Sequence, residues 1–426
     1  MKSKTKIMDT KIKRSIQIGG ILIAILMLTT GSVSACTGFT SSDEETVLVG
    51  TNFDWSHSFN VYIHFFPGEE GKYGRVTFEL QHSLGEDEDF GPDPDWIVPK
   101  QGMNDQGLFY DVYLAPYVVP VNSSDKPIFT SDDPDYYRFA LWAYCLAKCA
   151  TVSEVLDIFD QYNLLAIAEL QCFFVDKNGD SVIIEGDEIF FKEGNYQVVT
   201  NFYRSQWQPP YPCWRYNTAV DMLESMTELS VDYFSSICNA TQQTTTVHSN
   251  VYNLLEETIR VYYYKDFEKS LVFDLNEELA KGERRIHLGS LFEPEDNQPP
   301  EKPEAPTGPE SGNVSTEYKY FCKEASDPDG DRTMCLFDWG DGTMSNWIAP
   351  PRIGKISAEH NYTERGSYEI KVKAMDVYGR ESEWSDPLSV SMPKNKIINI
   401  SPLILQFLEN YPHLFSLLRQ ILLFLG

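Results

Sequence analysis

The spacing of apolar residues changes along the chain, and each change predicts a different kind of element. Short β-branched and aromatic runs between turn residues predict strands, beginning with a hairpin over residues 37–55 that turns at 41–45. Further strands are expected at 62–66, 74–80, 109–114, 196–201 and 251–264, with 171–176 and 181–185 forming a hairpin buried on one face. Helical spacing predicts helices at 136–149, 151–162, 219–229 and 231–240. Two groups of strands with helices between them favour an α+β fold of two stacked sheets covered by helices, an αββα layering.

A proline-rich segment at 296–312 separates this part of the chain from the next. It alternates proline with Glu, Lys and Gly, a composition typical of a semi-rigid, extended linker. Short strands separated by turn residues follow at 318–323, 335–339, 367–374 and 387–391. They predict a small all-β, immunoglobulin-like sandwich over 313–394, and the larger domain is expected at 36–295.

Both ends of the chain carry apolar segments. A basic head precedes an apolar run at 16–28, and Val33-Ser34-Ala35 supplies the small residues that signal peptidase requires, which predicts a signal peptide over 1–35. The protein is then expected to be secreted or held at the cell surface. The tail at 395–426 is apolar but interrupted by Pro402 and Pro412, which leaves too few helical residues to span a bilayer. Two interpretations of the tail stay open: contact with a membrane interface, or packing against its own β-domain.

The charge of the chain excludes one class of partner. Its formal net charge is −28, and loss of residues 1–35 removes six basic residues and Asp9, a net of five positive charges, which gives −33. Such a surface repels nucleic acid at long range. The sequence also contains no C-x-x-C pair or His-rich spacing of the kind that indicates zinc.

The eight cysteines suggest more than one role. Setting Cys36 aside leaves seven, so at least one of them is a thiol if all bridges are intramolecular. The preferred disulfide is Cys322–Cys335, and the second choice is Cys213–Cys238. Cys145 and Cys149 lie four apart on a predicted helix, which is poor disulfide geometry, and are expected to be packed thiols.

Cys36 is the most informative of these cysteines because cleavage after Ala35 makes it the first residue of the processed chain. Its α-amine then titrates near 7.7–8.0 and its thiol near 8.5. One residue therefore carries both a nucleophile and a general base at neutral pH. Two plainer explanations remain: a cysteine at this position by chance, or a bacterial-type lipoprotein cleavage box, in which Cys36 is lipidated and tethers the protein to a membrane.

Several short motifs share the order and spacing of one enzyme family. They are Cys36-Thr37-Gly38-Phe39, Gly50-Thr51-Asn52-Phe53-Asp54-Trp55, the turn from Gly102 to Leu108, Asp176 to Asp180, Val199-Thr200-Asn201, Cys213 to Tyr216, and Val251 to Leu254 leading to Tyr262 to Tyr264. With these motifs the chain resembles the choloylglycine hydrolase and penicillin V acylase family over about residues 36–290. The resemblance implies an N-terminal nucleophile (Ntn) hydrolase with a four-layer αββα fold that cleaves linear amide C–N bonds without a cofactor.

The resemblance also implies roles for individual residues. Cys36 matches the nucleophile, whose α-amine takes the thiol proton and later protonates the leaving amine. Asp54 matches the carboxylate that orients this amine, and Asn201 matches an oxyanion donor. Arg215 matches an arginine near the nucleophile, and Tyr113 is our choice for a second oxyanion contributor. The plainer interpretations are a strand-end cap for Asp54, a turn former for Asn201 and a surface arginine for Arg215.

One position departs from the family pattern. The family usually carries arginine where this chain has Thr51, so a positive charge that favours the thiolate is missing. Either Arg215 suffices, another cation such as Arg204 takes its place, or activity is weak. The aromatic residues expected near the site suit an apolar acyl group; they are Phe53, Trp55, Phe109, Tyr110 and Tyr113.

The C-terminal segment resembles a polycystic-kidney-disease-type (PKD) immunoglobulin-like domain. Its usual marks are present as Asp327 to Asp331, Phe337 to Thr343 and His360-Asn361-Tyr362. Asp327, Asp329 and Asp331 alternate along the chain, which is compatible with Ca²⁺ binding and also with plain turns. The domain is expected to serve surface attachment or partner contact rather than chemistry.

The leading hypothesis is an exported cysteine-type amidase that hydrolyses N-acylated small molecules or peptides through an acyl-thioester on Cys36. Two alternatives stay open on this sequence. One is a surface lipoprotein that binds rather than cuts, with the β-domain as its adhesion module. The other is an acyltransferase on the same fold, which passes the acyl group to an amine instead of water.

Overall fold

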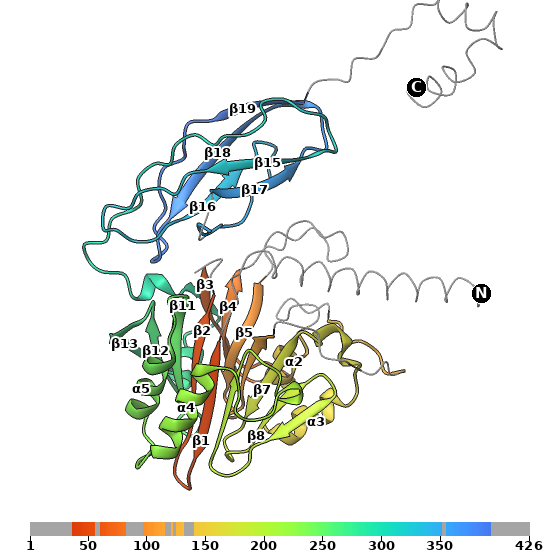
Figure 1. Cartoon of the computed structure of the whole chain (residues 1–426), viewed down its shortest axis with the longest axis vertical. Helices are drawn as coiled ribbons and strands as arrows, with labels where there is room; N and C mark the ends of the chain where they lie inside the picture. Colours follow the sequence, from red (N-terminus) through yellow and green to blue (C-terminus); the bar gives the residue numbers. More distant parts are fainter. Residues whose placement is uncertain are drawn as a thin grey trace, which may run out of the picture.

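The computed structural model describes residues 36–55, 60–81, 97–115, 121, 125–131, 140–351 and 355–392. The predicted signal peptide at 1–35 and the tail at 395–426 lie outside these residues. The described chain forms a larger α+β part, followed by a β-sandwich that lies beyond one end of its strands (Figure 1).

Two antiparallel sheets form the centre of the α+β part (Figure 1). The six-stranded sheet has the order β10-β1-β2-β11-β12-β13, and the eight-stranded sheet has the order β14-β3-β4-β5-β6-β7-β8-β9. The strands of the first are β10 (Tyr196–Thr200), β1 (Thr37–Ser42), β2 (Val47–Asp54), β11 (Thr246–Asn253), β12 (Thr258–Tyr263) and β13 (Asp266–Asp274). Those of the second are β14 (Arg284–His287), β3 (Val61–Phe66), β4 (Arg75–Gln81), β5 (Ile97–Asn104), β6 (Phe109–Leu114), β7 (Leu170–Val175), β8 (Ser181–Glu185) and β9 (Glu188–Phe191).

Helices cover the outer face of each sheet. The helices α4 (Trp214–Ser225) and α5 (Val231–Thr241) pack on the six-stranded sheet, and α2 (Leu141–Lys148) and α3 (Val152–Phe159) pack on the eight-stranded sheet (Figure 1). A short helix α6 (Leu275–Leu279) and three 3-10 turns, η1 (Leu164–Ile167), η2 (Arg204–Gln206) and η3 (Gly289–Leu291), complete this part. The αββα layering predicted from the sequence is confirmed by this arrangement.

Local sequence explains where these elements start and how they are buried. The Thr151 side chain accepts a hydrogen bond from the backbone N–H of Glu154, and the Glu154 side chain accepts one from Thr151, a reciprocal cap that begins α3 where predicted. The strands β7 and β8 are buried on both faces, one against the inter-sheet core and the other against α2 and α3. The expectation of a hairpin buried on one face was therefore wrong, because the helix layer covers the second face.

The C-terminal part is a two-sheet β-sandwich. One sheet pairs β15 (Glu317–Cys322) with β17 (Ile356–Asn361), and the other has the order β16 (Met334–Asp338), β18 (Gly366–Met375) and β19 (Leu388–Met392). The proline-rich segment 296–312 runs along this sandwich, because Thr307 and Phe321 exchange two backbone hydrogen bonds and the Gly312 N–H donates to Ser391.

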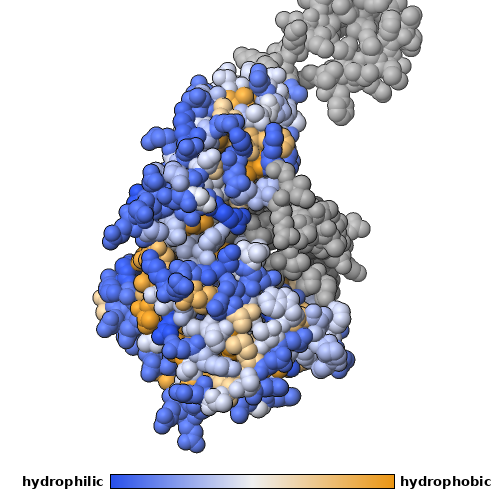
Figure 2. All heavy atoms as spheres, turned by 60° about the vertical axis from the view of Figure 1, so that its left-hand side comes forward, coloured by the Kyte–Doolittle hydropathy of each residue, from blue (hydrophilic) through white to orange (hydrophobic). Residues whose placement is uncertain are grey.

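The two parts share one apolar core. Met375 and Val377 of the sandwich cluster with Tyr263 and Phe292 of the larger part, and the Tyr263 hydroxyl donates a hydrogen bond to the Val377 carbonyl. Most of the visible surface of both parts is hydrophilic, with smaller apolar patches (Figure 2). Within the described residues, no helix combines the length and the apolar character needed to cross a bilayer.

Candidate active site

Antiparallel pairing brings three strand ends together around Cys36. Thr37 at the start of β1 pairs with Asn52 of β2 on one side and with Thr200 of β10 on the other. Cys36 therefore lies between the end of β2, which is Asp54, and the residue that follows β10, which is Asn201. The Cys36 side chain is 5% exposed, and its Sγ lies 3.8 Å from the backbone oxygen of Asp54.

Asp54 is fully buried and held by three neighbours. Its carboxylate accepts hydrogen bonds from Gln243 Nε2 at 2.7 Å and from the Thr246 hydroxyl, and Arg215 Nη1 lies 4.0 Å from its Oδ2. Burial raises the pKa of Asp54 to about 6, while the two hydrogen bonds and the Arg215 charge oppose this shift. Gln243 and Thr246 were missed by sequence reasoning because they belong to the loop before β11, where no motif marks them.

Arg215 fixes the backbone next to the sulfur. It is the second residue of α4, and its Nη1 donates hydrogen bonds to the Cys36 carbonyl and to the Thr37 hydroxyl at 2.8 Å. The predicted helix at 219–229 begins five residues earlier in the structure, at Trp214, and this extra turn carries Arg215 to the site. The surface interpretation of Arg215 does not hold, because the residue is 5% exposed.

Asn201 lies on the opposite side of Cys36 from Asp54. Its Nδ2 donates a hydrogen bond to the Leu114 carbonyl at 2.6 Å, which ties it to the end of β6. Its Oδ1 is buried and has no hydrogen-bond partner among the described residues. An amide N–H near the sulfur can donate to an oxyanion, and this role of Asn201 stays a prediction.

The protonation state of Cys36 depends on these surroundings. In the full-length chain its nitrogen is still joined to Ala35. Burial raises the pKa of the thiol to about 12, and the nearby carboxylates of Asp54 and Asp111 raise it further, while the Arg215 charge lowers it. The thiol therefore needs both a nearby base and positive charge to act as a nucleophile at neutral pH.

Tyr113 takes part in a buried polar cluster rather than standing ready for a ligand. Its hydroxyl donates to Asp111 Oδ2 at 2.6 Å, and the Thr51 hydroxyl donates to the same carboxylate oxygen at 2.7 Å. A side chain at Gly38 would meet the Tyr113 hydroxyl, because an added Cβ would lie 2.0 Å from its oxygen. Burial raises the pKa of Asp111 to about 7 and holds the pKa of Tyr113 well above its ordinary value.

Two expectations about the surroundings of Cys36 need correction. Tyr110 does not face the site: it packs with α2 and α3, because successive residues of β6 alternate faces and only Phe109, Asp111 and Tyr113 face the other sheet. Arg204 does not replace the missing cation, because its guanidinium lies over the Phe190 ring, 5.2 Å from the centroid, in a different cavity.

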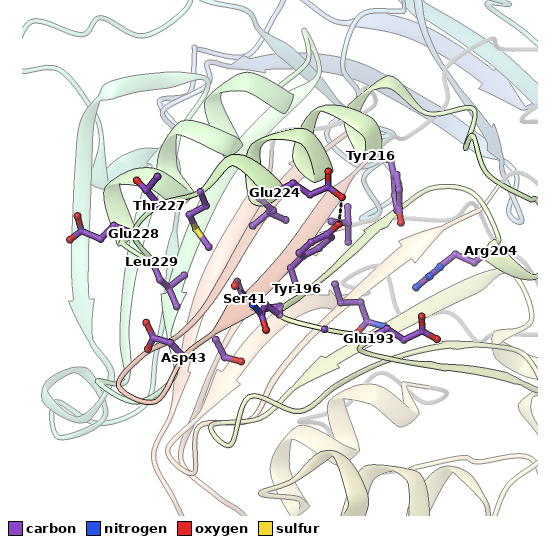
Figure 3. Close-up of a pocket in the computed structure, with 17 residues that line it drawn as sticks. Ser41, Asp43, Glu193, Tyr196, Arg204, Tyr216, Glu224, Thr227, Glu228 and Leu229 are labelled. Atoms are coloured by element: carbon purple, nitrogen blue, oxygen red, sulfur yellow. Dashed lines mark hydrogen bonds between the residues drawn. The ribbon is translucent and has the colours of Figure 1, made fainter.

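That cavity lies away from the chemistry. It has a volume of about 610 Å³ and is lined by Ser41 to Asp43 at the turn of the first hairpin, the opposite end of β1 from Cys36. A six-residue strand spans roughly 20 Å, so the cavity does not open onto the sulfur. Figure 3 shows Arg204 at one side of it and the hydrogen-bonded pair Tyr196 and Glu224 between α4 and the sheet.

The remaining predicted sites are not supported. Among the described residues, no group of three or more His, Cys, Asp or Glu side chains is placed to hold a metal ion, and the Asp327 carboxylate instead accepts hydrogen bonds from the backbone N–H groups of Asp329 and Asp331. Both predicted disulfides were wrong in this structure, where all eight cysteines are thiols. Cys322 and Cys335 nevertheless pack in the same core from opposite sheets of the sandwich.

The C-terminal residues match a known domain family. A family model described as PKD domain matches residues 307–386. The sandwich is a PKD domain. The chain is similar to the PKD domain of an M14-like peptidase from a Thermoplasmatales archaeon, with 37% sequence identity over 23% of this chain and 99% of that one and a TM-score of 0.21.

Two enzymes are among the solved structures to which the chain is similar. A variant of the conjugated bile acid hydrolase from Clostridium perfringens shares 16% identity over 59% of this chain and 96% of its own, with a TM-score of 0.43. Penicillin V acylase from Agrobacterium tumefaciens shares 18% identity over 56% of this chain and 90% of its own, with a TM-score of 0.36. No curated protein matches the chain.

Proposed function

We propose that this chain is an exported, cysteine-dependent amidase that hydrolyses linear amide C–N bonds of N-acylated small molecules or peptides. The observation that carries the proposal is the meeting of Cys36, Asp54, Asn201 and Arg215 at one end of the six-stranded sheet. These residues come from four separate segments of the chain. A cysteine that serves only as packing does not require a buried carboxylate and a buried guanidinium beside its backbone.

The proposed reaction starts when removal of residues 1–35 frees the α-amine of Cys36. The neutral amine takes the proton of the thiol, and the thiolate attacks the carbonyl carbon of the substrate amide. The amine then gives this proton to the leaving nitrogen, the C–N bond breaks, and an acyl-thioester remains on Cys36. Water, deprotonated by the same amine, attacks the thioester carbonyl, and release of the carboxylic acid restores the thiol.

Each neighbour of Cys36 has a proposed task in these steps. Asp54 orients the amine and stabilises its ammonium form, since its carboxylate is buried and already held by Gln243 and Thr246. Asn201 turns its amide from Leu114 toward the substrate oxygen, where negative charge develops. Arg215 holds the Cys36 carbonyl, which fixes the position of the nucleophile relative to both.

The burial of the sulfur weighs against the lipoprotein alternative. Cys36 is 5% exposed and sits at the junction of three strand ends, which leaves little room for a thioether-linked diacylglycerol. The apolar rings at this end of the sheet, Phe53 and Trp55, stack on each other with centroids 6.4 Å apart. They suit a substrate with an apolar acyl group. We also propose that the PKD domain serves attachment at the cell surface.

The test uses the processed protein, whose mass and N-terminal sequence first establish whether Cys36 carries an unmodified amine. A panel of N-acyl amino acids, N-acyl amines and short N-acyl peptides is then assayed for released amine. Cys36→Ala is expected to abolish turnover and Cys36→Ser to leave a weaker nucleophile, while Cys145→Ala, which removes another buried thiol, leaves turnover intact. Full activity of Cys36→Ala would overturn the proposal, and transfer of the acyl group to an added amine would identify an acyltransferase.

A further inference from the structure

A β-bulge interrupts β5 next to the active site. Phe78 of β4 pairs with Gln101, but the next residue, Glu79, pairs with Pro99, so Lys100 has no partner on β4. Proline cannot donate to a strand ladder, which favours a bulge at this point. The indole N–H of Trp142 anchors it by donating to the Pro99 carbonyl at 2.9 Å.

The bulge directs two consecutive side chains to the same face of the sheet. Gln101 reaches the six-stranded sheet, where its Oε1 accepts hydrogen bonds from the Tyr252 hydroxyl at 2.9 Å and from Asn250 at 3.2 Å. Lys100 reaches it as well, because its Nζ lies 5.8 Å from the centroid of the Trp55 ring, and Trp55 directly follows Asp54. In a regular strand these neighbours would point to opposite faces, so the bulge is what brings Lys100 inward.

The place that Lys100 reaches already holds negative charge. The Asp111 carboxylate is buried between the sheets under the hydroxyl groups of Thr51 and Tyr113, and it raises the pKa of the Cys36 thiol. Lys100 interacts electrostatically with both Cys36 and Asp111. A carboxylate this close to a nucleophilic sulfur opposes thiolate formation unless a cation balances it.

We propose that Lys100 supplies the positive charge that Thr51 does not provide, and that it holds the Cys36 sulfur in the thiolate form during turnover. Lys100 is thus a positioning residue for the thiolate charge, delivered from the eight-stranded sheet by the bulge. Arg204 lies in another cavity, and Arg215 is engaged by the Cys36 carbonyl and Thr37. The inference rests on the proposed function only in taking Cys36 as the nucleophile.

The charged and titratable groups around Lys100 define what a pH experiment reports. They are Cys36, Asp111 and, beyond Cys36, Asp54 and Arg215, with Glu79 on β4 bound to Thr77 and Arg285 and with His248 on β11. Burial lowers the pKa of His248 to about 3, so it stays neutral above pH 4. Changes between pH 6 and 10 therefore reflect Cys36, its own amine, Lys100 and the two aspartates.

The experiment measures thiol reactivity, which needs no substrate. Processed wild-type protein is alkylated with iodoacetamide between pH 5 and 10, and mass spectrometry of the N-terminal peptide follows Cys36 alone. Lys100→Gln is expected to slow alkylation about tenfold at neutral pH, which corresponds to a rise of about one unit in the apparent pKa of the thiol. Lys100→Arg keeps the charge and is expected to retain most of the wild-type rate.

Lys192→Gln is the matched control. Lys192 is also partly buried, but its ammonium donates to Ser42 at the far end of the first hairpin, so its removal is expected to leave the pH profile unchanged. A Lys100→Gln profile equal to that of wild type would overturn the inference, as would an equal loss in Lys192→Gln.

A second comparison covers the case in which Lys100→Gln does not fold because Asp111 is left without a balancing charge. On an Asp111→Asn background, Lys100→Met removes the ammonium without leaving a buried anion. The inference expects Asp111→Asn alone to speed alkylation at neutral pH, and the added Lys100→Met to slow it again. No difference between the two would overturn it. Absence of amidase activity in the wild type would instead count against the proposed function, since alkylation is read independently.

Discussion

At the residue scale, burial of charge explains most of the site. Asp54 and Asp111 are both enclosed, and burial raises the pKa of the first to about 6 and of the second to about 7. The motifs pointed to Cys36, Asp54, Asn201 and Arg215 because short conserved-type strings mark strand ends. They did not point to Lys100 or Asp111, because a bulge breaks the alternation from which inward-facing residues are recognised and Asp111 lies inside an apolar strand.

Asp111 makes stability depend on pH. Its folded pKa of about 7 lies above the unfolded value near 3.9, so between roughly pH 4 and 7 the folded state binds more protons than the unfolded state. The free energy of unfolding is therefore expected to fall as pH rises through this window, by up to about 1.4 kcal/mol per pH unit for one proton. Urea unfolding at pH 4.5 and 7 tests this. Asp111→Asn, which keeps an acceptor for Thr51 and Tyr113, should show a smaller loss, and an unchanged slope would contradict the assignment.

Gly38 is required by the close approach of Tyr113. An added Cβ would lie 2.0 Å from the Tyr113 hydroxyl and 3.1 Å from Val199 Cγ1, and both neighbours are buried. Gly38→Ala is expected to destabilise the fold by about 1–3 kcal/mol through overpacking, measured by chemical unfolding. Gly366→Ala is the control, because its Cβ would meet only Tyr368 at 3.2 Å, and an equal loss in both variants would argue against the Tyr113 contact as the cause.

At the element scale, strands and helices with apolar periodicity were predicted and polar or short ones were not. The opening hairpin, α3 and α5 follow from spacing and caps. The strand β13 was missed because its residues alternate charge with exposure as an edge strand, and β9, β14 and α6 are only four or five residues long. The start of α4 was missed because Cys213 offers no side-chain cap, and this is the turn that carries Arg215.

The reciprocal cap at α3 offers a test at this scale. Thr151→Ala removes the side chain that accepts from the Glu154 N–H at 3.3 Å, so a loss of about 0.5–2 kcal/mol in the free energy of unfolding is expected. Ser153→Ala, two residues on and exposed, lacks any capping role and is expected to be neutral. A similar loss in both would show that general helix propensity, rather than the cap, sets the effect.

At the scale of the whole molecule, the PKD domain lies close to the active-site end of the first sheet (Figure 1). Its Arg332 lines a small cleft with Trp55, Tyr264 and the loop 244–247, and the Trp55 N–H donates to the Thr245 carbonyl at 2.9 Å. The same loop supplies Thr246 to Asp54. Domain docking therefore supports the segment that holds the carboxylate next to Cys36, a connection that no sequence motif expresses because it depends on the tertiary contact.

Separating the two domains is therefore expected to affect both stability and turnover. Val377 is fully buried in the shared core, where its carbonyl accepts from Tyr263, and Val377→Asp would place an unpaired carboxylate there. We expect calorimetry to resolve two transitions in this variant where wild type shows one, and kcat to fall because the loop at 243–246 loses its support. Val390→Asp, buried in the core of the sandwich itself, is the contrast: it should unfold the PKD domain first and reduce kcat only as far as docking is lost with it. A single transition and wild-type kcat in Val377→Asp would mean that the domains do not depend on each other.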